Sequence, residues 1–200
     1  TELITATQAQ KFIKPTKIQE LVIPKILCDK SLIGQAPTGT GKTMAYLLPI
    51  FQKLDTKNAH IQAVILSPTY ELAMQTARTS AELAKLSGIE LRSQGLIGGA
   101  NISRQIEMLK KKPQIIVGSA GRIIELVRKN KLNLQDVKFL VLDEFDRLLD
   151  DQNHSTIMEV VKYLPKQFIY LMFSAKSSLS TGKLEKSAFA GKTSAGAARK

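Results

Sequence analysis

The chain has 200 residues, 44% hydrophobic and 23% charged, so it is long enough to bury the core of one globular domain. Its 29 basic and 17 acidic residues give a formal net charge of +12, which favours a polyanionic partner, although a merely basic surface gives the same sum. A single cysteine excludes an internal disulfide framework. The longest apolar run, residues 168–173, is too short for a membrane-spanning helix, which needs about 20 residues. We therefore expect a soluble, cytoplasmic chain with no membrane partner.

Strand-like and helical segments alternate along most of the chain. Residues 1–30 favour a helix at 19–27, broken by Pro15 and Pro24. After them, short runs rich in β-branched residues predict strands, and the stretches between have the apolar spacing of helices. The predicted strands are 32–34, 63–66, 91–97, 115–117, 139–142 and 168–173, and the predicted helices are 42–54, 71–86, 102–109, 122–128 and 155–163, the last capped by Asn153. This alternation predicts an α/β fold with a largely parallel sheet and helices on both faces.

Residues 177–200 differ in composition from the rest of the chain. They are mostly Ser, Ala, Gly and Lys, with only Leu179, Leu184 and Phe189 as large apolar side chains. That is too little apolar surface to offset an ordering cost of about 1–2 kcal/mol per residue. We therefore divide the chain into a domain at 1–176 and a flexible low-complexity tail at 177–200 that need not be native to the fold.

The strongest local signal is Ala36-Pro37-Thr38-Gly39-Thr40-Gly41-Lys42-Thr43, between a predicted strand and a predicted helix. It fits the A-x-x-G-x-G-K-T variant of the phosphate loop, because Ala36 stands where the usual pattern has glycine. Gly39 and Gly41 let backbone N–H groups wrap a phosphate at a helix amino terminus. Lys42 would reach the β- and γ-phosphates, and the Thr43 hydroxyl would ligate Mg²⁺. The alternative, an ordinary glycine-rich turn, does not account for the strand before it and the helix after it.

An acidic tetrapeptide, Asp143-Glu144-Phe145-Asp146, directly follows the predicted strand 139–142. Asp143 is placed to hold Mg²⁺, and Glu144 to orient and deprotonate an attacking water. Taken alone, the tetrapeptide is better explained as an acidic helix start favoured by the dipole. Together with the phosphate loop, it indicates a nucleoside triphosphate site at the carboxyl edge of the sheet.

These motifs resemble, in order along residues 11–176, those of the amino-terminal RecA-like lobe of a DEAD-box RNA helicase. Residues 12–19 resemble the adenine-reading Q motif, 36–43 motif I, 68–73 motif Ia, Gly98-Gly99 the glycine pair, 119–122 motif Ib, 143–146 motif II and 174–176 motif III. The resemblance implies a RecA-like P-loop fold and an ATP-dependent helicase. Such an enzyme separates short RNA duplexes by nucleotide-gated closure of two lobes, so the second lobe is expected in the complete protein and this lobe alone should be nearly inactive.

The resemblance also assigns roles to single residues. Lys42, Asp143 and Glu144 would be catalytic, with ATP and Mg²⁺ as cofactors and the metal held by Thr43 and Asp143. Asp146 and Ser174 would couple the nucleotide state to lobe closure. Nucleotide binding would involve Phe12, Thr16, Gln19, Ala36, Pro37, Thr38, Gly39, Thr40, Gly41, Lys42 and Thr43, and sequence-independent RNA binding would involve Pro68, Thr69, Tyr70, Glu71, Gly98, Gly99, Ser119, Gly121 and Arg122.

Five positions depart from the family pattern. Tyr70 replaces an arginine, Phe145 a small alanine and Lys176 a threonine, while Ser119-Ala120 replaces Thr-Pro but keeps a hydroxyl for a helix cap. Two other functions stay open: a DNA-directed or other helicase-like P-loop motor ATPase, and a non-catalytic RNA-binding fragment.

The lone cysteine and the two histidines have no assigned chemistry. Cys28 is expected to pack on a helix face, because no second thiol or histidine lies near it in the sequence. His60 and His154 have no partners at ligand spacing. We expect no metal site besides that of the nucleotide's Mg²⁺.

Overall fold

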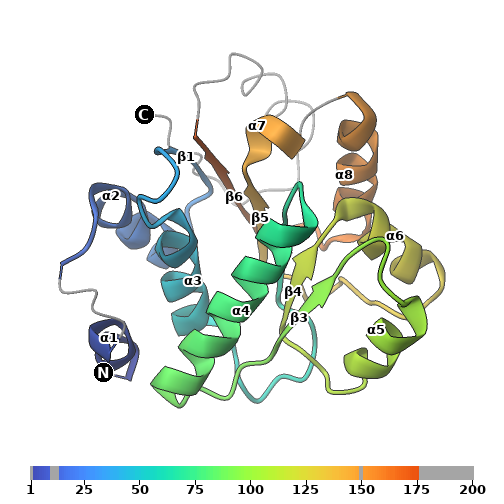
Figure 1. The fold of residues 1–200 in the computed structure, drawn as a ribbon, viewed down its shortest axis with the longest axis horizontal. Helices are drawn as coiled ribbons and strands as arrows, with labels where there is room; N and C mark the ends of the chain where they lie inside the picture. The colour runs from blue at the N-terminus through green and yellow to red at the C-terminus, as the bar shows by residue number, and fades with distance from the viewer. Residues whose placement is uncertain (1, 10–13, 149–150, 176–200) are drawn as a thin grey trace.

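The computed structural model describes residues 2–9, 14–148 and 151–175, and the predictions for Phe12, Lys176 and the tail lie outside these residues. Six strands of the described part form one parallel sheet in the order β1-β6-β5-β2-β4-β3 (Figure 1). The strands are β1 (Leu32–Gln35), β2 (Ala63–Leu66), β3 (Ser93–Leu96), β4 (Ile115–Gly118), β5 (Phe139–Asp143) and β6 (Ile169–Ser174). The predicted α/β class and the parallel sheet are confirmed.

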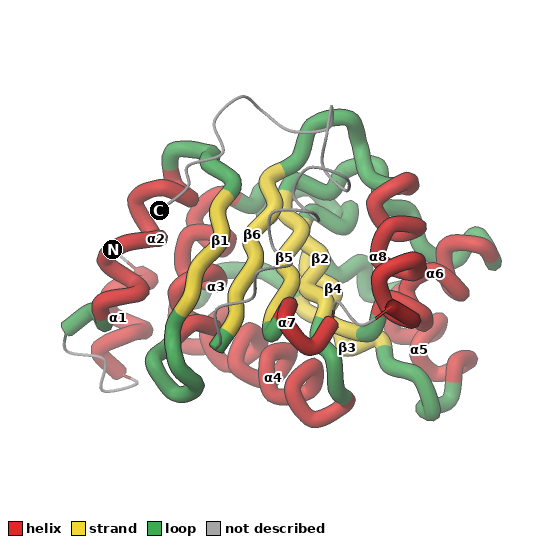
Figure 2. Tube along the Cα trace, turned by 90° about the horizontal axis from the view of Figure 1, so that it is seen from above, coloured by secondary structure: helices red, strands yellow, loops and turns green. Residues whose placement is uncertain are grey.

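Helices cover both faces of this sheet, as the view from above shows (Figure 2). The helices are α1 (Glu2–Ala9), α2 (Lys17–Leu27), α3 (Lys42–Lys53), α4 (Tyr70–Ser87), α5 (Ile102–Leu109), α6 (Ala120–Arg128), α7 (Phe145–Leu148) and α8 (Asp151–Tyr163). Successive strand residues alternate between the faces: Ala63 and Ile65 join the core under α2, α3 and α4, whereas Val64 and Leu66 join the core under α6 and α8. Because both faces are covered, β2, β4, β5 and β6 are buried along their whole length.

Three local predictions about the helices are wrong. α2 continues through Pro24, because Ile18, Val22 and Ile26 are buried against the core and outweigh the lost backbone hydrogen bond. α8 begins at Asp151, so Asn153 lies inside the helix and does not cap it. Cys28 is the exposed C-cap residue of α2 and not a packing residue, because the helix ends one residue earlier.

The segments that follow the strands meet at one edge of the sheet, where backbone hydrogen bonds join them. Ala36 N donates to the Ser174 carbonyl oxygen at 3.0 Å, and Ser67 N donates to that of Gly118 at 3.0 Å. Ser119 N donates to the Leu96 carbonyl oxygen at 3.1 Å. Gly118 is required for this last contact, because a Cβ there would overlap the same Leu96 oxygen. The edge that should carry the site is therefore tied together strand by strand.

Among the described residues, no helix combines the length and the apolar character needed to cross a bilayer.

Candidate functional site

The phosphate loop joins the end of β1 to the start of α3. Gly39 and Gly41 have φ angles of 80° and 87°, which only glycine adopts at little cost. The Thr40 hydroxyl donates to the Pro37 carbonyl oxygen at 2.6 Å and closes the turn. Gly41 is the N-cap of α3 and offers no side chain to the first N–H groups of the helix. The loop thus presents a helix amino terminus suited to a phosphate group.

Lys42, the first residue of α3, is held by the loop itself. Its side chain is buried, with the residue 8% exposed, and Nζ donates to the Ala36 carbonyl oxygen at 2.6 Å and to the Pro37 carbonyl oxygen at 2.9 Å. These neutral acceptors satisfy the buried ammonium group without a ligand. A phosphate oxygen would be a stronger, charge-assisted acceptor, so the ammonium can exchange carbonyls for phosphates.

Gln19, in the first turn of α2, connects that helix to the phosphate loop. Its Oε1 accepts from Thr16 N at 3.0 Å, and its Nε2 donates to the Gly41 carbonyl oxygen at 3.1 Å. A side-chain amide has two lone pairs and two N–H bonds, so one acceptor and one donor position remain for adenine. A cavity of about 440 Å³ adjoins this point and is lined by Thr16, Lys17, Ile18, Leu21, Gln35, Ala36, Pro37 and Thr40.

Asp143 ends β5 beside Phe173 of β6 and is 8% exposed. Its Oδ2 accepts a hydrogen bond from the Tyr46 hydroxyl at 2.9 Å. Burial raises the pKa of Asp143, the Tyr46 hydrogen bond opposes that rise, and the charges of Glu144 and Lys42 act in opposite directions. The hydrogen bond therefore offsets only part of the cost of burying the charged form of this carboxylate.

Glu144 follows directly in a strained backbone conformation, with a φ angle of 51°. Its Oε2 accepts from Arg147 Nη1 at 2.9 Å, and the side chain is mostly shielded from solvent. Asp146 lies on α7, and its buried Oδ1 has no hydrogen-bond partner among the described residues. Ser174 is fully buried at the end of β6.

Thr43 and Asp143 offer the hard oxygen donors that Mg²⁺ prefers. In the described part of the chain, no group of three or more His, Cys, Asp or Glu side chains could hold a metal ion. Mg²⁺ commonly takes one or two protein oxygens, several waters and substrate phosphates, and a hydroxyl and a carboxylate match this preference. The residues present fit the implied metal.

The other predicted residues line the same edge beyond β5. Thr69 caps α4, its hydroxyl accepting from Leu72 N at 3.3 Å, and Tyr70 is 54% exposed beside it. Gly98 and Gly99 are exposed, and a Cβ at either would meet nothing within 4 Å. Ser119 is the N-cap of α6, but its hydroxyl makes no capping bond, so the expected hydroxyl cap is wrong. Pro68, Glu71 and Gly121 lie at the same helix starts.

Arg122 is enclosed instead of facing solvent. Its Nη1 donates to the Ala100 carbonyl oxygen at 3.2 Å and to Gln105 Oε1 at 3.0 Å, and its Nε lies 3.0 Å from Glu125 Oε2. The guanidinium group thus fastens the loop after Gly99 to α5 and α6, which is a positioning role. Sequence reasoning missed this network, as it missed Tyr46 and Gly118, because their partners are distant in the sequence.

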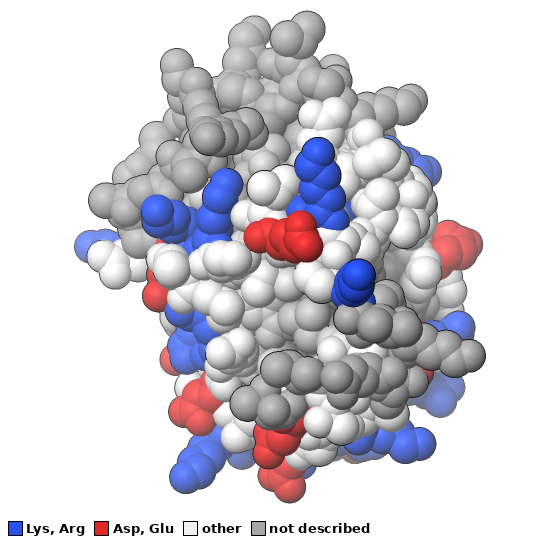
Figure 3. All heavy atoms as spheres, turned by 90° about the vertical axis from the view of Figure 1, so that its left-hand side faces the viewer, with Lys and Arg blue, Asp and Glu red and all other residues white. Residues whose placement is uncertain are grey.

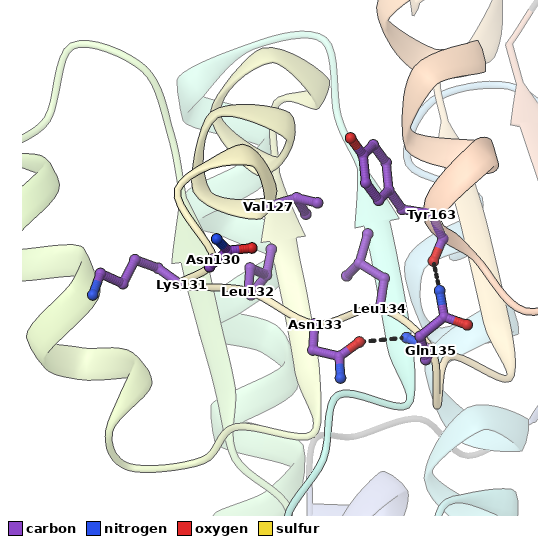
Figure 4. Close-up of a pocket in the computed structure, with 8 residues that line it drawn as sticks. All are labelled: Val127, Asn130, Lys131, Leu132, Asn133, Leu134, Gln135 and Tyr163. Atoms are coloured by element: carbon purple, nitrogen blue, oxygen red, sulfur yellow. Dashed lines mark hydrogen bonds between the residues drawn. The ribbon is translucent and has the colours of Figure 1, made fainter.

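Cavity size does not distinguish this edge of the sheet. A cavity of about 450 Å³ lies at the opposite edge, between the ends of α6 and α8 (Figure 4). Its lining comprises Val127, Asn130, Lys131, Leu132, Asn133, Leu134, Gln135 and Tyr163, and Gln135 Nε2 donates to the Tyr163 carbonyl oxygen at 2.8 Å. On the face over α1, α2 and β1, the visible basic side chains are interspersed with acidic and uncharged ones (Figure 3). The site is therefore defined by the groups that meet at this edge, namely the phosphate loop, Gln19 and Asp143.

A pair of glycine substitutions tests the contact between Gln19 and the phosphate loop. Alanine in the left-handed conformation costs about 1–2 kcal/mol, so Gly39→Ala and Gly41→Ala should both lower the free energy of unfolding. Only at Gly41 would the Cβ meet another residue, 2.6 Å from Gln19 Nε2, so Gly41→Ala should cost more. Urea denaturation measures both. Equal losses, or a difference that persists in a Gln19→Ala background, would contradict the contact.

A second substitution tests the cost of burying the Asp143 charge. The raised pKa means that the folded state holds the proton more tightly than the unfolded state. Stability is therefore lost as pH rises from the ordinary value of 3.8 to the folded pKa. Without Mg²⁺, Asp143→Asn should be more stable than the unsubstituted chain at pH 7, by about 1.4 kcal/mol for each pH unit that separates the folded pKa from the ordinary one. The advantage should shrink towards pH 4 in parallel denaturation series, and a less stable variant at pH 7 would refute the account.

Comparison with known proteins gives concordant results. A sequence model of DEAD/DEAH box helicases matches residues 16–181. The probable ATP-dependent RNA helicase YfmL of Bacillus subtilis is 43% identical over 167 residues, covering 84% of this chain and 44% of that protein. A DEAD box protein from Methanococcus jannaschii has a TM-score of 0.87 at 34% identity, covering 99% of this chain and 53% of that one.

A further solved structure, S. cerevisiae Dbp5 bound to RNA and ADP BeF3, has a TM-score of 0.83 at 31% identity, covering 96% of this chain and 49% of that one. The chain spans less than half the length of the B. subtilis protein. The match extends over most of the chain and includes each motif that the structure gathers at the carboxyl edge, and on these grounds the chain belongs to the DEAD/DEAH box helicase family.

Proposed function

We propose that this chain is the ATP- and RNA-binding lobe of an ATP-dependent RNA helicase. The observation that carries the proposal is the convergence of the phosphate loop and the buried Asp143 at one edge of the sheet. The B. subtilis relative is more than twice as long as the matched segment, which supports a second lobe in the complete protein.

Nucleotide binding would begin with an exchange of partners in the phosphate loop. The N–H groups at Gly39, Gly41 and the start of α3 receive the phosphates, while Lys42 Nζ moves from the carbonyl oxygens of Ala36 and Pro37 to phosphate oxygens. Gln19 uses its remaining acceptor and donor on the N6 and N7 edge of adenine. Guanine presents two acceptors on that edge, so adenine is preferred.

Thr43 and Asp143 would hold Mg²⁺, which supplies positive charge to neutralise the transferring phosphoryl group. Glu144 accepts the proton of the attacking water. Arg147 Nη1 donates a hydrogen bond to Glu144 Oε2 and so restricts the rotation of that carboxylate. The strained backbone at Glu144 fixes its position relative to Asp143.

RNA would bind along the second half of the edge. The amino termini of α4 and α6 and the exposed Gly98-Gly99 turn offer backbone N–H groups to phosphates, so contacts are independent of base sequence. Tyr70 contributes an exposed hydroxyl, and Arg122 holds the turn in place. The match to Dbp5 covers 96% of this chain and 49% of Dbp5. That structure is bound to RNA and ADP BeF3, which supports the proposal that this chain binds RNA and a nucleotide.

Coupling to a second lobe would use Asp146 and Ser174. The buried Oδ1 of Asp146 lacks a partner among the described residues, an unfavourable state that a group brought by lobe closure would relieve.

Substitution of Lys42 tests the nucleotide site. Lys42→Ala removes the ammonium group that follows the phosphates, so affinity for a fluorescent ADP analogue with Mg²⁺ should fall about 10- to 100-fold. Lys53→Ala, at the other end of α3, is the control and should bind as the unsubstituted chain does. In competition, ADP should displace the probe at lower concentration than GDP. Equal binding by the Lys42 and Lys53 variants would refute the site.

The second experiment tests whether rapid ATP hydrolysis requires a group from the second lobe. An arginine that neutralises the γ-phosphate is worth about 10³–10⁵ in rate. Arg122 and Arg147 are engaged elsewhere, with Ala100 and Gln105 and with Glu144, respectively. Residues 1–200 should therefore hydrolyse ATP very slowly, with or without single-stranded RNA, and a longer chain with the second lobe should show RNA-stimulated turnover. Robust stimulation of the short chain would overturn this mechanism, and stronger stimulation by DNA would indicate a DNA-directed motor.

A further inference from the structure

Tyr46 is a buried phenol whose hydroxyl is directed at the acidic group of the site. It lies on α3 three residues after Thr43, it is fully buried, and its hydroxyl donates to Asp143 Oδ2 at 2.9 Å. From the sequence, it is placed only within the predicted helix 42–54. Filling a core needs the ring and not the oxygen, and a buried hydroxyl is costly unless it is hydrogen-bonded. The oxygen therefore calls for an explanation of its own.

We propose that Tyr46 is a positioning residue that orients the Asp143 carboxylate for Mg²⁺ bound with a nucleotide. This inference rests on the proposed nucleotide site. It makes Tyr46 a hydrogen-bond partner of a metal ligand, and such partners fix the orientation of the ligand.

The hydrogen bond acts on the orientation of the carboxylate. Oδ2 is tied to the Tyr46 hydroxyl at 2.9 Å, so rotation of the carboxylate is restricted. A ligand that is already oriented loses less entropy when the metal binds.

Tyr46 is suited to remain the donor of this bond. Burial, and then the neighbouring Asp143 carboxylate, raise the pKa of the Tyr46 hydroxyl well above 10.0, so it keeps its proton at neutral pH. Tyr46 thus lies on α3 three residues after Thr43 and hydrogen-bonds to Asp143, and Thr43 and Asp143 are the two residues expected to hold the metal.

The ring of Tyr46 is itself fixed by the sheet. It packs against Phe173 with ring centroids 5.4 Å apart and an interplanar angle of 46°. Phe173 lies in register with Gly34 on one side and with Asp143 on the other. Gly34 makes room for the Phe173 ring, because a Cβ there would lie 2.8 Å from Phe173 Cε1. The strand that leads into the phosphate loop, the neighbouring strand and the phenol therefore support Asp143 as a unit.

The test is a Mg²⁺ titration of fluorescent ADP binding to Tyr46→Phe, which keeps the ring and removes only the hydroxyl. Loss of a partner behind a metal ligand commonly lowers metal affinity 10- to 100-fold, so the half-maximal Mg²⁺ concentration should rise about tenfold or more. Affinity for ADP in excess EDTA should not change. Tyr170→Phe is the matched control, because Tyr170 is buried in the core on the opposite face of the sheet.

Other outcomes separate positioning from packing. An unchanged Mg²⁺ midpoint, or an equal fall of affinity with and without Mg²⁺, would assign Tyr46 to packing and overturn the inference. In an Asp143→Asn background, adding Tyr46→Phe should not shift the midpoint further, and a further shift of the same size would also overturn it. If the unsubstituted chain binds ADP without any Mg²⁺ dependence, the metal part of the proposed function fails, and the inference fails with it.

Discussion

Parallel pairing requires each strand of this sheet to be followed by a crossover, so the segment after every strand starts at the same edge. This constraint brings together groups that are far apart in the sequence: Gln19 and Gly41, Tyr46 and Asp143, Arg122 and Ala100. The strand order places β6 between β1 and β5, and the Tyr46 and Phe173 rings bridge the phosphate loop to the acidic group across it. The site is a consequence of strand direction and order.

The same edge accumulates polar groups that the protein must satisfy before a ligand arrives. Lys42 is held by two loop carbonyls, Gln19 by Thr16 and Gly41, and Asp143 by Tyr46. Each interaction uses a neutral partner where a charged phosphate or cation would bind more strongly. The loop is thus stable when empty, while the groups that bind the ligand are already at the site. Part of the burial cost remains at Asp143, whose pKa stays raised, so binding function costs some stability.

The fold could be predicted from the sequence because its signals are local. Each strand is a short apolar run, and the phosphate loop and the acidic tetrapeptide are contiguous, so their positions follow from chain order. The predicted helix break at Pro24 is wrong because tertiary burial of Ile18, Val22 and Ile26 outweighs a local rule. The supporting residues could not be predicted: the partners of Tyr46 and Arg122 are brought near by the fold, and Gly118 matters only because β3 passes beside it. Ser119 kept its predicted cap position but not the capping bond.

A crystal structure of this chain with ADP and Mg²⁺ would test the central claim most directly. The account predicts phosphates against the amino terminus of α3, Lys42 Nζ transferred from the Ala36 and Pro37 carbonyls to a phosphate oxygen, and the metal on the side of Thr43 and Asp143. It also predicts that the Tyr46 bond to Asp143 is retained. A nucleotide bound elsewhere, such as beside Tyr163 at the opposite edge, or a nucleotide in the loop with Lys42 still on the carbonyls, would contradict it.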